Sequence, residues 1–525
     1  MNRKQCAIVG GAIIASAAAP VGADIVREWN DTFLSIVRLQ GGSPGSISRA
    51  SAMINVAIFD AVNAIDRTDH FPQSFKPYLR TLAPAPSGAS REAAAVAAAY
   101  TIFSNIYPMQ SDDNPSIGPM IQLRHDTQMA LIPDGPAKAN GIAVGEAVGG
   151  QMLLLRFLDG SEGNPTYIPG GQPGDWCVTP DGPFVPALAP HWGNVRTWAL
   201  DSADQFRPTR LAALGSMNDL VRSAAYAEQI NGSASVPSVK TLGARASAVR
   251  TADQTEAAWF WANDRQGTSK PPGHLIQITQ RVAEDQGLSL SQSARLFALV
   301  SMGMADAGIA AWDIKYNTPI DLWRPIDAIR ETMDDSNPLT TPDPAWLPLN
   351  DFTPPFPAYV SGHATFGAVH AAVLRRFFGT DFITFTIGSD EFSVHPSLGY
   401  PAGLTRTFTS FSQAAWENAM SRIWLGVHFE WDAVDGNVLG TQIGEFISDR
   451  QLRPVRSGPC PADLNADQVV DNVDFVTFSD QYALFDCTIG AMPADCVADI
   501  NSDGVVDAGD FVLFSMAYFD FACPE

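Results

Sequence analysis

The stretch FPAYVSGHATFG, residues 356–367, decides the fold prediction, because it marks a helix start at which polar groups gather. Ser361 is a good N-cap residue, and the Ala/Val/Phe-rich run that follows it through Leu374 predicts a helix. The first turn of a helix offers unpaired backbone N–H groups and positive dipole character, so Gly362 N–H and the Ser361 hydroxyl could hold an anion. His363 would lie beside that anion. Taken alone, the Ser-Gly-His triplet is weak evidence, and a structural histidine is the simpler interpretation.

A second stretch, SRIWLGVHFEWD at residues 421–432, adds a cation, an imidazole and a carboxylate. On a helix, His428 lies close to two turns after Arg422, and Asp432 follows His428 by one turn, so the three would share roughly one face. A carboxylate one turn away could orient one imidazole nitrogen while the other ligates or attacks. The bulky apolar residues between them favour an interior position over a surface ion pair.

A third stretch, DIKYNTPIDLWRP at residues 313–325, carries Lys315 and Arg324 in a predicted helix-to-loop transition. By themselves these would be ordinary solvated charges. Together with Arg422 they supply three positive charges, which match an oxyanion that carries two or three negative ones.

These three stretches resemble the three-part signature of vanadium-dependent haloperoxidases and type 2 phosphatidic acid phosphatases. The elements that carry the resemblance are Arg-Pro, then Ser-Gly-His, then Ser-Arg with a histidine six residues after that arginine and an aspartate four beyond it. The flanking sequence is similar to the chloroperoxidase-like bacterial branch. Similarity extends over nearly all of residues 24–446, including 25–30, 247–255, 260–264 and 408–418.

The resemblance implies a role for each matching residue. His428 would be the axial nitrogen ligand of vanadium, or the nucleophile on phosphorus, with Asp432 beside it, and His363 would be the acid–base histidine. Asp264, in the Phe-Trp-Ala-Asn-Asp match, would pair with Arg422. The groups that bind the oxyanion would be Lys315, Arg324, Ser361, Gly362 and Arg422.

The sequence departs from the family pattern at two places. The family has six residues between the lysine and Arg-Pro, whereas eight separate Lys315 from Arg324, and a strict count would place Asn317 at the lysine position. Val360 replaces the usual proline before Ser-Gly-His, which loosens the turn but leaves the groups that contact the anion.

The favoured function is vanadate-dependent oxidation of a halide by hydrogen peroxide to hypohalous acid. Bound vanadate would be a Lewis acid, with His428 as its ligand and His363 removing a proton from peroxide. Phe356 favours this prediction, because chloroperoxidase-like members have phenylalanine where bromoperoxidases tend to have histidine. One alternative is a vanadate-inhibited acid phosphatase that acts on a phosphoester with a histidine nucleophile. Another is a non-catalytic exported protein with a role in assembly.

Charge separates the last part of the chain from the rest. The formal net charge is −23, and residues 459–525 contain thirteen Asp or Glu and no Lys, Arg or His. An acidic chain repels phosphate backbones and anionic headgroups, so nucleic acid and membrane surfaces are poor candidates for partners. The acidic tail instead suggests a bound cation.

The tail contains an internal repeat at a spacing of 36 residues. Each repeat places oxygen ligands at loop positions 1, 3, 5, 9 and 12, with a backbone carbonyl at position 7, as a calcium site requires. After each loop, aromatic residues at i, i+3 and i+7 give a helix one apolar face, and two such helices can pack together. The first loop would use Asp463, Asn465, Asp467, Val469, Asp471 and Asp474. The second would use Asp499, Asn501, Asp503, Val505, Asp507 and Asp510.

This repeat resembles a dockerin, which implies calcium binding and docking onto a cohesin-like partner. A related calcium repeat without a cohesin partner and an acidic solvated linker are the alternatives. Four cysteines in the tail predict two disulfides whose pairing stays open, while Cys177 stands alone in the main body and is expected to be buried and inert.

The predicted architecture is mainly α, with a helical-bundle catalytic domain and a small loop–helix repeat domain. Helical patterns cover residues 47–64, 91–107 and 137–158, residues 160–190 are too rich in Pro and Gly for regular structure, and a minor strand is possible near 382–387.

The first 23 residues order basic, apolar and small residues as a secretory signal does, although a membrane anchor with a short apolar run is the alternative. We therefore expect a secreted, periplasmic or cell-surface protein without a stable membrane span. The predicted units are a signal peptide at 1–23, the catalytic domain at 24–450 with its motif core at 315–432, a linker at 451–459 and the dockerin-like domain at 460–525.

Overall fold

A computed structural model provides the structure of the chain. It describes residues 23–69, 71, 74–80, 82–107, 114–163, 165–180, 186–331, 333–454, 462–464, 470, 472–485, 487, 496–500 and 504–520. The predicted signal peptide, except for its last residue, and residues 455–459 of the predicted linker lie outside these ranges.

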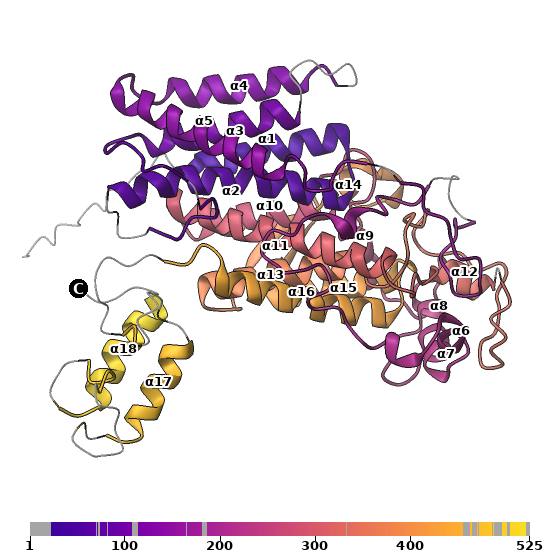
Figure 1. Cartoon of the computed structure of the whole chain (residues 1–525). Helices are drawn as coiled ribbons and strands as arrows, with labels where there is room; N and C mark the ends of the chain where they lie inside the picture. Colours follow the sequence, from indigo (N-terminus) through magenta and orange to yellow (C-terminus); the bar gives the residue numbers. More distant parts are fainter. Residues whose placement is uncertain are drawn as a thin grey trace, which may run out of the picture.

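Residues 23–156 form a group of helices at one side of the body, in indigo and purple in Figure 1. The predicted helical patterns are confirmed in α2, α3 and α5. Ser43 and Ser90 cap α2 and α3, because each hydroxyl accepts a backbone N–H of the first turn. The helices are α1 (Ala23–Gln40), α2 (Pro44–Thr68), α3 (Arg91–Ile106), α4 (Ile117–Ala130) and α5 (Pro136–Arg156).

The second half adds a group of long helices that pack against the first (Figure 1). They are α10 (Lys270–Asp285), α11 (Leu290–Tyr316), α13 (Gly362–Phe378), α15 (Phe411–Trp424) and α16 (Glu430–Arg450). Among the described residues, α11 is the one helix long and apolar enough to cross a bilayer. Its most apolar stretch is 94 % buried inside the protein, so α11 is the core helix of the body.

Short elements and irregular chain lie between the two groups and between the long helices of the second group. The helices among them are η1 (Trp192–Asn194), η2 (Ala212–Leu214), α6 (Met217–Val221), α7 (Ala224–Asn231), α8 (Val239–Leu242), α9 (Ala252–Phe260), α12 (Pro325–Arg330), α14 (Glu391–Val394) and η3 (Pro396–Leu398). Strands β1 (Phe385–Gly388) and β2 (Thr405–Phe408) form an antiparallel pair, close to the expected minor strand. The described part of residues 160–190 contains no helix, in agreement with its Pro/Gly-rich composition.

Helices α13 and α16 approach closely along a row of glycines. A Cβ atom at Gly440 would lie 2.2 Å from the carbonyl oxygen of Thr365, and one at Gly436 would lie 2.9 Å from that of Ser361. Small residues on α16 therefore let the two backbones meet. This contact brings the start of α13 and the start of α16 to the same place in the body.

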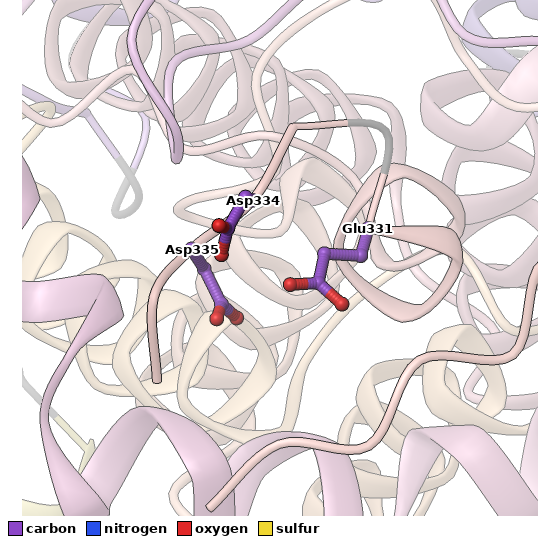
Figure 2. Close-up of side chains that lie close together, drawn as sticks. All are labelled: Glu331, Asp334 and Asp335. Atoms are coloured by element: carbon purple, nitrogen blue, oxygen red, sulfur yellow. The ribbon is translucent and has the colours of Figure 1, made fainter. Parts of the chain in front are cut away.

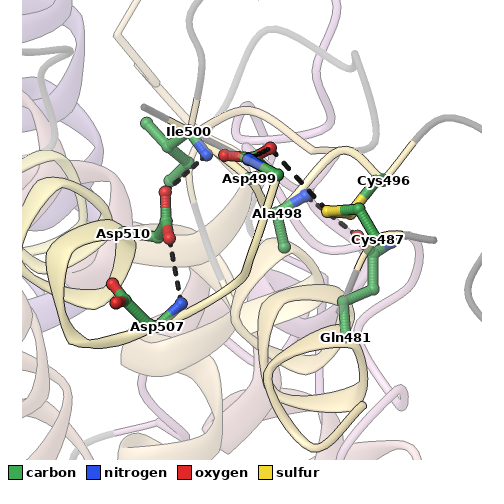
Figure 3. The surroundings of a disulfide bond; sticks show 9 residues. Gln481, Cys487, Cys496, Ala498, Asp499, Ile500, Asp507 and Asp510 are labelled. Atoms are coloured by element: carbon green, nitrogen blue, oxygen red, sulfur yellow. Dashed lines mark hydrogen bonds between the residues drawn. A yellow bond between two sulfur atoms is a disulfide. The ribbon is translucent and has the colours of Figure 1, made fainter. Parts of the chain in front are cut away.

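The tail has its own small core, separate from that of the body. Helices α17 (Asn472–Tyr482) and α18 (Ala508–Asp520) pack through their aromatic faces, and the Phe478 and Phe514 rings stack with centroids 4.7 Å apart. Cys487 and Cys496 form a disulfide beside this core (Figure 3). Cys460 and Cys523 lie outside the described residues.

The chain that leaves α16 stays on the body for four residues. Leu452 is buried in the main core, and Pro454 forms a β-bridge with Phe75.

The mainly helical fold predicted from the sequence is confirmed.

Candidate active site

The side chains predicted to bind an oxyanion lie together at the meeting point of several element ends. Lys315 comes from the last turn of α11, Arg324 is the N-cap residue of α12, and Arg422 lies in the last turn of α15. The remaining groups come from the starts of α13 and α16 and from the loop before α16: Ser361, Gly362, His363, His428 and Asp432.

Residues 422–432 do not form the continuous helix assumed from the sequence. Helix α15 ends at Trp424, Gly426 turns the chain with φ +80°, and α16 begins at Glu430. A Cβ atom at Gly426 would lie 2.5 Å from the carbonyl oxygen of Gly243, so the turn needs glycine for both its conformation and its close contact. His428 is therefore a loop residue, and its place beside Arg422 results from the turn.

The imidazole of His428 is fixed between a carboxylate and a guanidinium. Its Nδ1 lies 2.9 Å from Asp432 Oδ2, which also accepts the backbone N–H of Phe429 at 3.0 Å. A carboxylate acceptor places the ring proton on Nδ1, so the lone pair is on Nε2. This lone pair faces Nη1 of Arg324 at 3.1 Å.

The two arginines carry donors that have no partner among the described residues. Arg324 donates from Nε to Phe356 O and from Nη1 to Val427 O, both at 2.7 Å, while Nη2 is buried and unpaired. Arg422 donates from one Nη to Asp264 at 2.9 Å, while its Nε and its other Nη are buried and unpaired. A buried N–H without a partner costs about 1–3 kcal/mol, so these three donors fit an anion held between the arginines.

Lys315 reaches the site despite the longer spacing. Its ammonium is fully buried and donates to the carbonyl oxygens of Pro357, Ala358 and Val360 at 2.6, 3.1 and 2.5 Å. These bonds use all three of its N–H donors, so Lys315 fixes the turn before Ser361 and adds positive charge. Asn317, the residue at the strict family spacing, instead donates to Asn194 and Asp313.

Phe356 covers the two cations. Its ring centroid lies 5.1 Å from Lys315 Nζ, 4.7 Å from Arg324 Cζ and 5.0 Å from the Trp312 ring. An aromatic face at this distance attracts a cation and excludes water from it.

The start of α13 has the predicted N-cap. Ser361 Oγ accepts the backbone N–H of Ala364, and the Ser361 N–H donates to Asp432 O at 2.9 Å, which ties α13 to α16. His363 lies in the first turn, and its Nε2 is 3.1 Å from the carbonyl oxygen of Ala262. A carbonyl only accepts, so Nε2 carries the proton and Nδ1 is left with a lone pair.

Asp264 pairs with Arg422, as the resemblance implied. Lys270 holds this segment by donating to the backbone carbonyl oxygens of Asp264 at 2.6 Å and Arg265 at 2.9 Å, and its charge helps to lower the pKa of the Asp264 carboxyl. Lys270 was not predicted from the sequence, because it precedes Pro271-Pro272 in a stretch without a recognisable motif.

Buried positive charge controls protonation at the site. Burial, and then Arg324 and Lys315, hold the pKa of His428 well below its usual range, so the imidazole is neutral at neutral pH. Burial and the charge of Arg422 lower the pKa of His363 to about 3. Burial raises the pKa of Asp432, whereas at Asp264 the charge of Arg422, together with His363 and Lys270, outweighs burial and lowers the pKa of that carboxyl.

A cavity of about 420 Å³ opens beside Asp264. Apolar and aromatic side chains, among them Trp176, Phe352 and Val394, form much of its wall. This size suits a small organic molecule. The sequence did not mark Trp176 or Phe352, because they lie in segments without regular structure.

Polar groups form a network near this cavity. Arg265 Nε lies 3.0 Å from the buried carboxylate of Glu391, and His395 Nδ1 lies 3.3 Å from the same oxygen. His395, considered from the sequence as a residue of the site mouth, thus follows the wall residue Val394. Cys177, the lone cysteine of the body, is half-buried, and burial and Asp327 raise the pKa of its thiol to about 12.

A separate group of three carboxylates lies after α12. Glu331, Asp334 and Asp335 have oxygen atoms within 4.8 Å of one another (Figure 2). Asp335 accepts hydrogen bonds from Asn337 N and Thr340 Oγ1, so it stabilises the turn in which it lies. The cluster is therefore part of the structure of that turn.

The repeat in the tail is visible in its hydrogen bonds. Asp474 Oδ1 accepts from Leu464 N at 2.7 Å, and Asp510 Oδ1 accepts from Ile500 N at 2.8 Å, the same bond 36 residues later. In the second loop Asp499 also accepts from Gly504 N at 2.9 Å, and Figure 3 shows Asp499, Asp507 and Asp510 around this turn. The predicted ligands Asn465, Asp467, Val469, Asp471, Asn501 and Asp503 lie outside the described residues.

Comparison with known proteins agrees with this geometry. The VCPO second helical-bundle domain matches residues 295–457, which include most of the site. The chain is 28 % identical over 491 residues to the vanadium chloroperoxidase of Curvularia inaequalis, covering 77 % of this chain and 78 % of the relative.

Solved structures are similar in fold. A structure described as the first bacterial vanadium-dependent iodoperoxidase matches with a TM-score of 0.64 and 24 % identity, covering 83 % of this chain and 98 % of its own. An apo-type bacterial vanadium-dependent chloroperoxidase matches with a TM-score of 0.57 and 16 % identity, covering 79 % and 95 %. Residues 295–457 therefore match the VCPO second helical-bundle domain, and the chain shares the mainly helical fold of these vanadium-dependent haloperoxidase structures.

Proposed function

We propose that this chain is a vanadate-dependent haloperoxidase that uses hydrogen peroxide to oxidise a halide to hypohalous acid. The observation that carries the proposal is the set of three buried, unpaired guanidinium donors beside a neutral histidine. Arg324 and Arg422 would bind the oxygens of vanadate, and His428 Nε2 would be the nitrogen ligand. Bound vanadate would supply a Lewis-acid centre that activates peroxide toward attack by a halide.

The chain's own residues prepare this site for an anion. Asp432 keeps the proton of His428 on Nδ1, so Nε2 is available as a ligand. Lys315 holds the turn that positions Ser361 and Gly362, whose hydroxyl and N–H would complete the cradle at the start of α13. His363, with its free lone pair on Nδ1, would take a proton from peroxide and return it to the departing oxygen.

The same arrangement suits phosphate, which makes phosphoester hydrolysis the second candidate. An oriented histidine with its lone pair facing an arginine-lined anion site is what a phosphoryl-transfer nucleophile needs. In that case His428 would attack phosphorus and His363 would protonate the leaving group.

One experiment separates the two functions. Apoprotein is supplied with vanadate or with phosphate and assayed for bromination of monochlorodimedone with peroxide and for hydrolysis of p-nitrophenyl phosphate. We expect bromination only with vanadate and no hydrolysis. Hydrolysis that vanadate inhibits would support the phosphatase and overturn the proposal.

A pair of variants tests vanadate binding directly, with a measurement that does not depend on turnover. His428→Ala should abolish vanadate binding in calorimetry, whereas His125→Gln, which changes a histidine outside the site, should leave it unchanged. Vanadate binding that survives His428→Ala would contradict the assignment of His428 as the ligand, whereas a wild-type protein with neither activity would favour the non-catalytic assembly role.

We also propose that the tail binds calcium through its two loops and docks onto a cohesin-like partner. The equivalent hydrogen bonds at Asp474 and Asp510 support this, because they place a loop carboxylate in the same position in both repeats. Calorimetric titration of calcium into the full chain should give two sites, and Asp510→Asn should remove one. Two sites in that variant would contradict the ligand assignment.

We further propose that the protein is exported, since the basic, apolar and small residues at 1–23 match a signal peptide. Amino-terminal sequencing of protein secreted by the host should begin at Asp24. An intact Met1 on the mature protein would exclude cleavage at this position.

A further inference from the structure

A large cleft lies on the body at the end where α2, α5 and α16 finish. Its volume is about 1110 Å³, and four of the side chains that line it are cations: Arg67, Lys76, Arg80 and Arg450. Helix α16 spans about 30 Å at 1.5 Å per residue, and its start carries Asp432 while its end carries Arg450. The cleft is therefore distinct from the oxyanion site.

The four cations have no acidic partner. All four are exposed, and none forms an ion pair within 4.0 Å with another residue in the part of the chain that the structure describes. Most other arginines of the body have such a partner, for example Arg91 with Asp66 and Arg376 with Asp449. In a chain with 56 acidic and 33 basic residues, four exposed cations around one cleft favour a negatively charged occupant.

The chain that leads to the acidic tail leaves the described body at this cleft. Gln451 and Leu452 line it, Lys76 N donates to Arg453 O at 2.7 Å, and Pro454 bridges to Phe75. Seven residues, 455–461, separate Pro454 from Ala462, and at about 3.5 Å per residue they reach about 25 Å at most. A connection of at most this length keeps the tail within reach of the cleft.

The tail has the complementary charge. Residues 459–525 carry thirteen acidic groups and no cation. Some of these carboxylates face solvent, including that of Asp480 on α17. Opposite charges that are tethered close together attract each other at low ionic strength.

We propose that the cationic cleft formed by Arg67, Lys76, Arg80 and Arg450 is an intramolecular docking site for the acidic tail. The tail then has two states, one seated on the cleft and one extended from the body on its linker. Docking is electrostatic, so salt shifts the balance toward the extended state.

Carbodiimide cross-linking of the full chain tests this docking, because the reagent joins Lys76 Nζ directly to a carboxylate in contact with it. At about 0.01 M ionic strength the Debye length is about 30 Å, and at about 1 M it is about 3 Å. We expect links from Lys76 to tail carboxylates at low salt and a yield at least about fivefold lower at high salt. Calcium is held constant throughout.

Charge-reversal variants provide the matched comparison. Arg67→Glu/Arg80→Glu/Arg450→Glu keeps Lys76 as the reporter and should lower the cross-link yield at low salt to the high-salt level. Arg222→Glu, at an exposed cation away from the cleft, should leave the yield unchanged. Arg80→Gln alone should give an intermediate yield if the triple variant fails to fold. Small-angle scattering should show a larger radius of gyration wherever the yield falls.

Three results would overturn the proposal. The first is a Lys76 yield that neither salt nor charge reversal changes. The second is a link from Lys76 to the tail of another molecule in a mixture of isotopically labelled and unlabelled chains, which would make the cleft an interface between copies. The third is the absence of any link to the tail, while a sulfated polysaccharide binds the cleft and is lost in the triple variant.

Discussion

At the scale of single residues, the proposed chemistry depends on how His428 is held. Its Nδ1 bond to Asp432 leaves Nε2 toward Arg324, and burial among cations keeps the ring neutral. A neutral, oriented imidazole is the form that can ligate a metal. Asp432 therefore contributes to the site by orienting the imidazole of His428.

Replacing Asp432 by Asn tests this relationship. The amide oxygen can still accept from Phe429 N, but the negative charge that orients His428 is lost. We expect vanadate affinity to fall about 10–100-fold, as for other partners of metal-bound histidines. Calorimetric titration of the apoprotein measures it, and Asp449→Asn, at the exposed end of the same helix, is the control. Equal affinity in Asp432→Asn would show that the carboxylate does not orient the ligand.

Glu391 provides a prediction about pH and stability. Burial, and then the charge of Asp264, raise the pKa of Glu391 from 4.5 to about 7. Because the folded pKa lies above the unfolded one, this group's contribution to stability is present below about pH 4.5 and is lost as pH rises toward about 7. A pKa shift of this size corresponds to a loss of about 3 kcal/mol at most in the free energy of unfolding, at about 1.4 kcal/mol per pKa unit.

Glu391→Gln should remove this dependence. The difference in unfolding free energy between the variant and the wild type should increase in favour of the variant from pH 4.5 to pH 8, as measured by denaturant titration. A difference that is constant over that range would mean that Glu391 ionises normally in the folded protein.

At the scale of elements, the contact between α13 and α16 sets the geometry of the site, because the helices begin beside Ser361 and His428. The glycines of α16 allow this contact, and Ser361 N–H donates across it to Asp432 O. A change in the distance between these helices would separate the anion cradle from its histidine.

Gly440→Ala tests that contact. The new Cβ would lie 2.2 Å from Thr365 O, a backbone atom, so the helices must move apart. We expect a loss of about 1–3 kcal/mol in unfolding free energy and a fall in turnover. Gly150→Ala on α5 is the control, since its Cβ would meet nothing within 4 Å and helix propensity favours alanine. Equal stability of both variants would contradict the close packing.

At the scale of the whole molecule, body and tail have separate hydrophobic cores. The residues proposed to act on the oxyanion all lie in the body, which extends along the chain to Pro454. The tail is thus not needed to assemble the site.

Truncation tests where the body ends. A chain that stops after Pro454 should keep its halogenating activity and the melting temperature of the body. A chain that stops after Arg450 loses the buried Leu452, which costs about 1.5–3 kcal/mol, and should melt at a lower temperature. Differential scanning calorimetry compares the two, and equal melting temperatures would show that residues 451–454 add nothing to the body.

The sequence by itself determined which segments are helices, where Ser361 caps one of them, which residues could form an anion site, and that the tail repeats every 36 residues. These properties depend on local pattern and composition. Only the tertiary structure decided that Gly426 breaks the helix before His428, that Lys315 rather than Asn317 enters the site, and that Arg324 and Arg422 keep unpaired donors. The reason is physical: a donor becomes unpaired only when packing of distant segments removes the water around it, and no local pattern in a sequence records that burial.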